Sequence, residues 1–185
     1  MCNRYVSPEE ADIERFWHIG RRKENRWWEP TVTPLSIAPF LKLSPDGLEL
    51  SLGQWGLIPP WSISRIPRMQ SGARMSTNNA RSERVASAPT FRDAWRKGQR
   101  CIIPVATFDE PCWETGRCVW WRFSDANSHP LGLAGIWSNW VDPDGGEVVE
   151  SYAMLTVNAD HHPLMGRMVL VLVLVLTPSH GQVLA

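Results

Sequence analysis

The stretch Gly47-Leu48-Glu49-Leu50-Ser51-Leu52, continued by Gln54-Trp55-Gly56-Leu57-Ile58, decides the class of fold. Leucine recurs at every second position between polar residues, and this period of two is typical of a β-strand with one buried face. We expect the strand to end at Pro59-Pro60, because proline has no backbone N–H to donate to a neighbouring strand. The pattern therefore predicts a strand over residues 47–58.

The segments around this strand predict more strands than helices. Upstream, Ser7-Pro8 and the acids after them predict a helix start, and apolar residues at helical spacing extend this helix to about His18. Three prolines make residues 29–40 an extended, irregular segment. A further short helix is expected at 91–95, and further strands at 101–105, 119–123, 131–140 and 151–157. Because no strand–helix–strand rhythm is present, we predict an α+β or mainly β fold built on antiparallel pairs.

The composition limits the classes of function. A chain of 185 residues predicts a single domain. Its 19 basic and 19 acidic residues cancel, so any nucleic-acid site must be a local patch. Among its 11 tryptophans we expect most in the core, although exposed tryptophan is also what base-stacking surfaces use. No stretch reaches the roughly 18 apolar residues of a membrane helix, so no membrane partner is expected.

The cysteines indicate the compartment. Four cysteines without a CxxC pair or a signal peptide favour reduced thiols in a cytoplasmic protein. We therefore expect no disulfide, no metal site and no cofactor.

The first five residues, Met1-Cys2-Asn3-Arg4-Tyr5, contain a candidate nucleophile. Once Met1 is trimmed, as is common before a small side chain, Cys2 carries a thiol and an α-amine on neighbouring atoms. The amine titrates near pH ~8 and a free thiol near ~8.5, so both are partly reactive at neutral pH. The pair suits attack on an aldehyde, because the amine gives a Schiff base and the thiol then closes a thiazolidine ring. The alternative is a cysteine at this position by accident.

Other polar residues are candidates for proton transfer and hydrogen bonding. Glu110 lies where a buried strand runs into a loop with Pro111, and desolvation there would raise its pKa to a range suited to proton transfer. Its alternative role is that of a surface acid. Asn79 has the groups to bind a reacting oxygen, whereas Asn78 and Asn79 could equally cap the helix-like segment after them.

Arginines and histidines offer weaker candidates. Arg4, Arg74 and Arg81 have the charge to hold phosphates, but single arginines are ordinarily solvated or salt-bridged. His161-His162 follows a strand and could supply a base, but the pair is weak evidence for a metal site. Arg74 lies in a polar, basic segment, 62–76, which we expect to be a long loop.

Several motifs in one order resemble a known family over residues 1–168. The family is SRAP, the SOS-response-associated peptidases, also called abasic site processing proteins. Linked motifs in a fixed order are far more specific than any one of them. They are Met1-Cys2-Asn3-Arg4-Tyr5, Trp55-Gly56-Leu57-Ile58-Pro59-Pro60-Trp61, Asn79-Ala80-Arg81-Ser82-Glu83, Arg100-Cys101-Ile102-Ile103-Pro104 with Phe108-Asp109-Glu110, Leu133-Ala134-Gly135-Ile136-Trp137, and Leu155-Thr156-Val157-Asn158-Ala159.

The resemblance implies a SRAP-like α+β fold and a function in DNA repair. Family members bind single-stranded DNA at abasic sites, and the cysteine exposed by methionine removal forms a thiazolidine crosslink with the ring-opened sugar. Cys2 matches that nucleophile, Asn79 matches the asparagine that orients the sugar, and Glu110 matches the acid that assists ring opening and proton transfer. The family name also implies autoproteolytic or peptidase activity, but the sequence shows no conventional Cys/His arrangement around a substrate cleft.

The resemblance also implies a DNA-binding surface. Arg4 and Arg81 match residues near the DNA backbone, and Trp61 lies in a segment that shapes the DNA-facing groove. We expect Asn78 and Arg74 to belong to the same surface. The expected partner is single-stranded DNA that contains abasic sites, bound by a monomer.

The C-terminal end departs from the family pattern. In relatives of this type a histidine follows the segment 164–168, whereas here Val169 begins four exact Val-Leu repeats. We expect a SRAP domain at 1–168 and an aberrant tail at 169–185 that arises from a frameshift or truncation. The missing histidine is associated with reversal of the crosslink, so the alternative function is a non-reversing or crosslink-incompetent module for single-stranded DNA. His161 or His162 would be the candidate substitutes.

Overall fold

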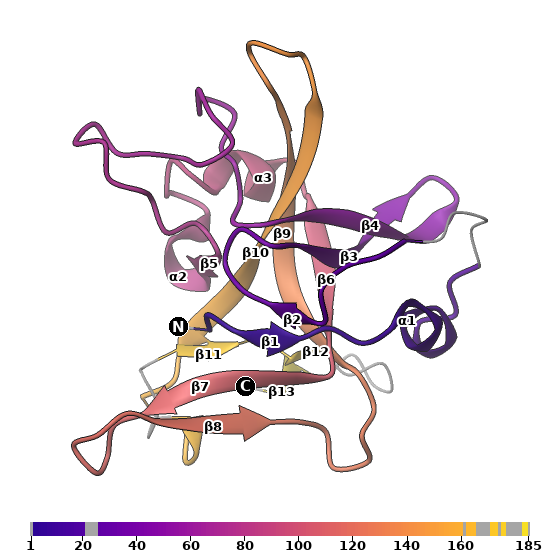
Figure 1. The fold of residues 1–185 in the computed structure, drawn as a ribbon, viewed down its shortest axis with the longest axis vertical. Helices are drawn as coiled ribbons and strands as arrows, with labels where there is room; N and C mark the ends of the chain where they lie inside the picture. Colours follow the sequence, from indigo (N-terminus) through magenta and orange to yellow (C-terminus); the bar gives the residue numbers. More distant parts are fainter. Residues whose placement is uncertain are drawn as a thin grey trace.

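The structure is a computed structural model that describes residues 2–20, 26–160 and 162–165, together with the backbone of three short strands between 171 and 184. In this part of the chain the fold is mainly β, with short helices around it (Figure 1). The predicted α+β fold, mainly antiparallel and with a single domain, is confirmed. The elements are β1 (Tyr5–Val6), α1 (Glu10–Phe16), β2 (Thr31–Val32), β3 (Ile37–Ser44), β4 (Gly47–Trp55), β5 (Asn79–Arg81), α2 (Ser82–Val85), α3 (Arg92–Arg96), β6 (Arg100–Val105), β7 (Thr107–Cys112), β8 (Val119–Phe123), β9 (Leu131–Val141), β10 (Val148–Asn158), β11 (Val171–Val173), β12 (Val175–Leu176) and β13 (Val183–Leu184).

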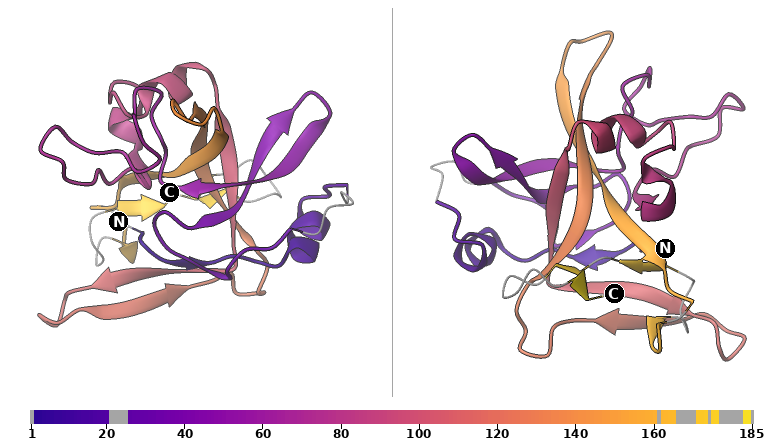
Figure 2. Two further views of the ribbon diagram at one scale, coloured as in Figure 1. Left: turned by 45° about the horizontal axis from the view of Figure 1, so that its top comes forward. Right: turned by 180° about the vertical axis from the view of Figure 1, so that it is seen from behind.

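The described strands form two sheets. The smaller has the order β2-β1-β7-β8, and the larger has the order β11-β10-β4-β3-β6-β9-β12-β13, with β5 paired to β10. Since β10 also pairs with β9, the strands β10, β4, β3, β6 and β9 close into a ring. Most pairs are antiparallel, but β10 runs parallel to β4 and β5. Figure 2 shows the hairpin of β7 and β8 set apart from this ring, with β1 between them.

The main core joins the two sheets. It contains Tyr5 and Phe108 from the small sheet and Trp55 and Tyr152 from the large one, and Cys2 belongs to the same buried cluster. Burial of these large side chains fixes the N-terminal segment against both sheets, because each removes an apolar area from water that contributes ~25 cal/mol per Å². The start of the chain is thereby a core element.

The strand that decides the fold is shorter than the sequence predicts. β4 ends at Trp55 because Gly56 adopts φ 144°, a conformation that favours glycine, and its N–H donates to the carbonyl of Tyr152 instead. The prediction of an irregular segment at 29–40 is wrong at Thr31–Val32, which forms β2, and from Ile37 onward, where β3 begins. Pro39 is tolerated there because β6 pairs with β3 only from Leu41, so the missing N–H of Pro39 faces no strand on that side.

The first helix also differs from the prediction. It begins at Glu10, with Glu9 at the N-cap, and it ends at Phe16 rather than at His18. Ser7 is no cap, because it lies outside the helix end and its hydroxyl donates to the carbonyl of Pro8. His18 cannot continue the helix, since it has a positive φ of 54°. Within the described residues, no helix combines the length and the apolar character needed to cross a membrane.

Candidate functional site

The N-terminal segment runs beside β7. Tyr5 pairs with Phe108, and the backbone N–H of Asp109 donates to the carbonyl of Arg4 at 3.0 Å. This ladder brings Cys2 to the level of Glu110, whose charge acts on the Cys2 thiol. In Figure 1 the N-terminus lies beside the ends of β5 and β10, so three segments distant in sequence meet at this point.

Two asparagines hold the backbone of Cys2. Asn79 donates from its Nδ2 to the Cys2 carbonyl at 2.8 Å, and the Nδ2 of Asn78 reaches the same oxygen at 3.3 Å. Asn78 also donates to the Oδ1 of Asn3 at 3.1 Å. Both asparagines are buried, and neither caps α2, whose N-cap is Arg81 without a side-chain bond. The structure therefore excludes the alternative of a helix cap and places both amides against the N-terminal segment.

The rigid frame behind these asparagines is the larger sheet. Asn79 opens β5 and pairs with Met154 on β10. The carbonyl of Asn78 accepts from the N–H of Met154 at 3.0 Å and from the Nε1 of Trp55 at 2.9 Å. Because both donors belong to the core, the two amide side chains are presented to Cys2 from a fixed position.

The thiol of Cys2 is fully buried. Its exposed fraction is 0%, and its Sγ donates to the carbonyl of Arg4 at 3.6 Å. Burial raises the pKa of the thiol far above its ordinary value, and the negative charge of Glu110 raises it further. At neutral pH the sulfur is therefore held as a neutral thiol.

Glu110 is a buried acid with a pKa in the neutral range. It lies within β7, opposite Trp121 on β8, so the prediction of a strand end at this residue is wrong. Pro111 is accommodated in β7 because β1 pairs only as far as Phe108. Burial raises the pKa of Glu110 to about 7, while the positive amino terminus lowers it. The alternative of a surface acid is thereby excluded, and the group is suited to both donating and accepting a proton near pH 7.

Asn79 carries a further polar group. Its Oδ1 is buried and has no hydrogen-bond partner within the part of the chain that the structure describes. A buried acceptor without a donor costs about 1–3 kcal/mol. The Oδ1 of Asn79 can therefore accept a hydrogen bond from a ligand, while the Nδ2 of the same side chain holds the Cys2 carbonyl.

The predicted DNA-binding residues fall into two groups. Arg4 and Asn78 belong to the centre around Cys2, and Arg81 is an exposed residue two positions after Asn79 on β5. Trp61 and Arg74 are exposed residues of the long loop between β4 and β5, outside the cluster of buried polar groups.

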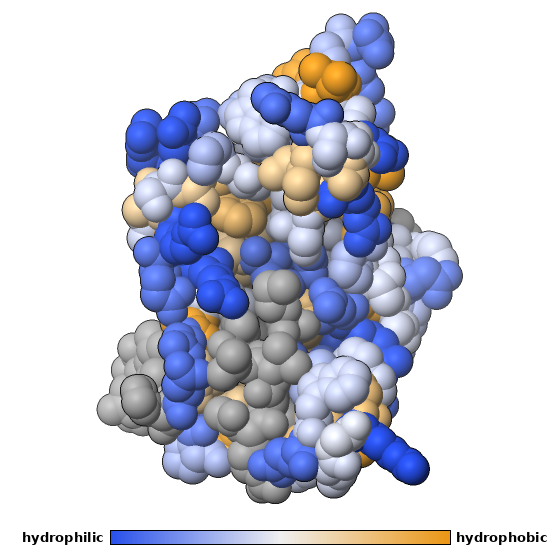
Figure 3. Space-filling model, turned by 90° about the vertical axis from the view of Figure 1, so that its left-hand side faces the viewer, coloured by the Kyte–Doolittle hydropathy of each residue, from blue (hydrophilic) through white to orange (hydrophobic). Residues whose placement is uncertain are grey.

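The long loop has a one-sided charge. From Pro59 to Ser82 the chain contains four arginines and no acid, although the whole protein is neutral. All four arginines are exposed, and hydrophilic side chains (blue) occupy much of the face from which the loop projects (Figure 3). The segment is therefore a local basic patch of the kind that the composition required for a nucleic-acid site. The four arginines are Arg65, Arg68, Arg74 and Arg81.

Sequence reasoning missed the partner of Arg4. The Nε of Arg4 donates to Asp109 at 2.7 Å, and Asp109 also accepts two bonds from Arg122. A hairpin with residues 107–112 as its first strand would have placed Asp109 opposite Arg122, but those residues were expected to include a strand end and a loop.

The histidines do not join this centre as far as the structure describes them. The Nδ1 of His162 accepts from the N–H groups of Leu164 at 3.3 Å and Met165 at 3.0 Å, so this nitrogen stabilises a local turn. His161 and Val169 lie outside the described residues. Of the predicted tail, only the backbone of β11, β12 and β13 is described; β11 pairs with β10, and β12 pairs with β9.

Comparison with known proteins identifies relatives over most of the chain. The model of a family described as SOS response associated peptidase (SRAP) matches residues 1–175. The abasic site processing protein HMCES of Gallus gallus is 29% identical over 175 residues, which cover 76% of this chain and 51% of that protein. Its counterpart in Xenopus tropicalis is 27% identical over 174 residues, with 78% and 50% covered. The chain spans about half the length of these relatives.

Solved structures have the same fold. A protein from Bordetella bronchiseptica, 31% identical, superposes with a TM-score of 0.82 and covers 95% of this chain and 84% of its own. A protein from Bacteroides thetaiotaomicron, 21% identical, superposes with a TM-score of 0.71 over 96% of this chain and 78% of its own. The second likeness concerns the fold alone.

Proposed function

Because this chain belongs to the SOS response associated peptidase (SRAP) family, we propose that it captures abasic sites in single-stranded DNA as a covalent adduct of Cys2. The observation that carries the proposal is the convergence of Cys2, Asn79 and Glu110 in one buried centre. The names of the relatives, abasic site processing proteins, support the same substrate. Removal of Met1 is the one peptide cleavage that the proposal requires.

The proposed reaction joins an aminothiol to an aldehyde with loss of one water. The neutral α-amine of Cys2 adds to the aldehyde carbon of the ring-opened sugar and gives a carbinolamine. A proton donated to its hydroxyl releases water and leaves a protonated Schiff base. The thiol then gives up its proton, and the sulfur adds to the imine carbon to close a neutral thiazolidine.

Glu110 suits both proton transfers in this sequence. With a pKa of about 7, it donates its proton to the departing hydroxyl at neutral pH and becomes a carboxylate. The carboxylate then accepts the proton of the Cys2 thiol. Without this base, the burial of the thiol and the nearby negative charge keep the thiol protonated. Glu110 ends the reaction protonated, as it began, so the protons balance.

The asparagines orient the nucleophile. Their bonds to the Cys2 carbonyl restrict rotation of that residue, and so fix where its α-amine and its Sγ point. The buried Oδ1 of Asn79 is positioned to accept a hydrogen bond from a hydroxyl of the opened sugar. Such a bond would favour the ring-opened form, which alone presents the aldehyde.

The basic loop supports DNA as the carrier of the aldehyde. The segment from Pro59 to Ser82 contains four arginines and no acidic residue. Its positive charge therefore attracts the phosphates of a DNA strand. This loop leads directly into Asn78 and Asn79, so a strand bound along it arrives at the reactive centre.

The test is a crosslinking assay with a single-stranded oligonucleotide that contains one abasic site. After mass spectrometry has verified the loss of Met1, we expect an adduct that survives denaturation, and none with Cys2→Ala. Cys118→Ala is the matched control, because Cys118 is an exposed free thiol and its loss should leave the adduct intact. A preparation that retains Met1 should give no thiazolidine.

Two outcomes would overturn the proposal. One is an adduct that persists in Cys2→Ala, which would assign the chemistry to another residue. The other is binding of the oligonucleotide by the processed protein without any adduct, which would leave a non-covalent module for single-stranded DNA.

A further inference from the structure

A second arginine lies beside Arg4 on the other side of Asp109. Arg122 on β8 is directly opposite Asp109 on β7, and it donates from Nε at 2.9 Å and from Nη2 at 3.1 Å. Arg4 donates to the same carboxylate from its Nε at 2.7 Å. The Asp109 side chain is 3% exposed, whereas those of Arg4 and Arg122 are 41% and 60% exposed. One buried acid thus holds two exposed guanidinium groups at the surface.

Both guanidinium groups retain unused donors. A guanidinium presents several N–H groups in a fixed fork, and only one of Arg4 and two of Arg122 go to Asp109. The described part of the chain gives neither arginine another acceptor. Two cations against one carboxylate leave a net positive charge at this point of a protein whose total charge is zero.

Arg4 is also held from a second side. Its Cζ lies 5.0 Å from the centre of the Trp120 ring, a cation–π contact. Trp120 is itself half exposed, so the ring covers the guanidinium without enclosing it. The remaining N–H groups of Arg4 therefore have a defined direction before any ligand binds.

Asp109 does not use all the donors of the two arginines. Arg4 bonds Oδ2 of this carboxylate and Arg122 bonds both of its oxygens, so Asp109 is satisfied. The N–H groups that remain on the two guanidinium groups match the oxygens of a phosphate.

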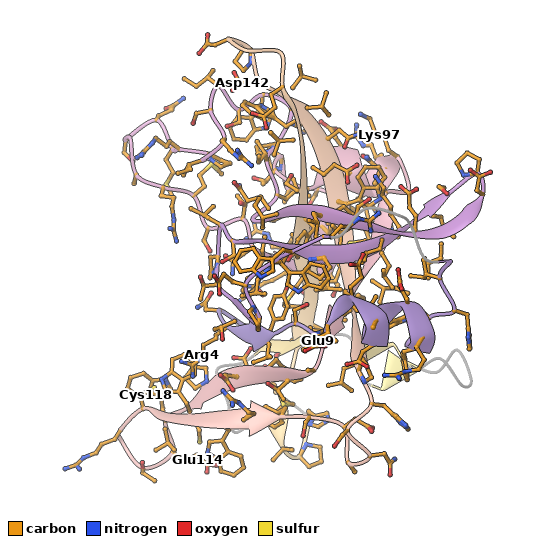
Figure 4. All side chains as sticks on the ribbon, turned by 45° about the vertical axis from the view of Figure 1, so that its right-hand side comes forward. Arg4, Glu9, Lys97, Glu114, Cys118 and Asp142 are labelled. Atoms are coloured by element: carbon orange, nitrogen blue, oxygen red, sulfur yellow. The ribbon has the colours of Figure 1, made fainter. Side chains whose placement is uncertain are left out.

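We propose that Arg4 and Arg122 together bind one phosphodiester of the DNA strand, beside the nucleotide that reacts with Cys2. Asp109 is the positioning residue that holds the two guanidinium groups in register. This site rests on the proposed function, because it takes its ligand to be the strand that carries the aldehyde. Figure 4 shows Arg4 close to the turn of the β7–β8 hairpin, near Glu114 and Cys118.

The position on β7 makes the bound phosphate a flanking one. Asp109 directly precedes Glu110, and neighbouring residues of a strand point to opposite faces of the sheet. The arginine pair and the buried acid therefore lie on two sides of the same strand. A DNA strand that reaches both the arginine pair and Glu110 must pass the N-terminal segment. The bound phosphate therefore belongs to a nucleotide next to the reacting one.

The test uses an oligonucleotide with a tetrahydrofuran abasic analogue, which has no aldehyde and binds without a covalent bond. The logarithm of the binding constant falls linearly with the logarithm of the salt concentration, by about 0.7 per phosphate contact for single strands. We expect Arg122→Ala to reduce this slope by about 0.7. Arg117→Ala, an exposed arginine in the turn of the same hairpin, should leave the slope unchanged.

A phosphate scan identifies the contact. Replacing single linkages by neutral methylphosphonates should weaken wild-type binding at one linkage beside the analogue, and that penalty should disappear in Arg122→Ala. Asp109→Asn should reduce the same penalty, although it removes a negative charge, which by itself would strengthen binding. Thermal unfolding of each variant verifies that it is folded. Inorganic phosphate at millimolar concentration should not compete, since a single free anion lacks the rest of the strand.

The proposal fails if Arg122→Ala and Arg117→Ala give the same slope. It also fails if the methylphosphonate penalty persists unchanged in Arg122→Ala. Neither result depends on crosslinking, because the analogue carries no aldehyde. A missing adduct with a true abasic site would instead contradict the proposed function and leave this site standing.

Discussion

Replacing Glu110 with glutamine should remove a pH dependence of stability that the wild-type protein shows around neutrality. The carboxyl has a pKa of about 7 in the folded protein, raised from 4.5 by burial. The folded state therefore holds this proton more tightly than the unfolded state does. The contribution of the neutral Glu110 carboxyl to the free energy of unfolding is fully present below about pH 4.5. This contribution is lost as the pH rises through about 7.

The expected magnitude follows from the two pKa values. One pH unit between them corresponds to ~1.4 kcal/mol, so the interval from 4.5 to about 7 corresponds to about 3 kcal/mol. Stability of small domains is only about 5–15 kcal/mol, so a loss of this size is readily measured. Glu110→Gln keeps the shape of the side chain and has no proton to lose in this range.

The assay is urea unfolding of both proteins at several pH values between about 5 and 8. The difference in unfolding free energy between the two is the informative quantity, because every other group titrates equally in both. We expect wild type to lose up to about 3 kcal/mol relative to Glu110→Gln across this range. A difference that stays constant with pH would refute the reasoning, since it would mean that Glu110 is charged in the folded protein throughout this range.

Further predictions concern the amide clamp, the basic loop and the core. Asn79→Ala should lower the unfolding free energy by about 1 kcal/mol and slow adduct formation, because the Cys2 carbonyl keeps only the longer bond to Asn78; an unchanged adduct rate would contradict the orienting role. Arg74→Ala should reduce the salt slope of binding to single-stranded DNA by about 0.7, and an unchanged slope would remove it from the DNA surface. Gly135→Ala should cost about 1–3 kcal/mol in urea unfolding, since its Cβ would lie 2.9 Å from a backbone oxygen of β10, whereas Gly145→Ala has open space and should cost little.

Local patterns in the sequence are enough to place five of the described strands, which are β4, β6, β8, β9 and β10. β8 and β9 occur within one residue of the predicted bounds, because alternation and turn residues determine them locally. β3 was not predicted because it contains Pro39. A proline fits in this strand only because β6 does not pair with β3 at that residue, which the local sequence does not reveal. Pairings such as that of β10 with β9, which closes the ring, depend on the tertiary fold, about which a local pattern says nothing.

The site shows the same division. The sequence offered Glu110 as either a desolvated acid at a strand end or a surface acid, and the structure places it in the core, within β7. The hydrogen bonds from the side chains of Asn78 and Asn79 to the Cys2 carbonyl join residues 76 and 77 positions apart. The ion pair of Arg4 with Asp109 joins residues 105 positions apart. Such contacts depend on the tertiary fold, so the sequence suggested the groups and left their partners undetermined.

Burial of Cys2 has a consequence for the order of steps in the proposed reaction. A thiol whose pKa is raised far above neutrality has almost no thiolate at pH 7, so the sulfur is a poor first nucleophile. The α-amine must therefore attack first, and the Schiff base that it forms supplies the electrophile and the positive charge that make deprotonation of the neighbouring thiol favourable. Glu110, by then a carboxylate after protonating the leaving hydroxyl, is the base for that step. Burial thus keeps the free thiol protonated and protects it from oxidation and side reactions until an aldehyde has bound. Ring closure therefore depends on the presence of the correct substrate.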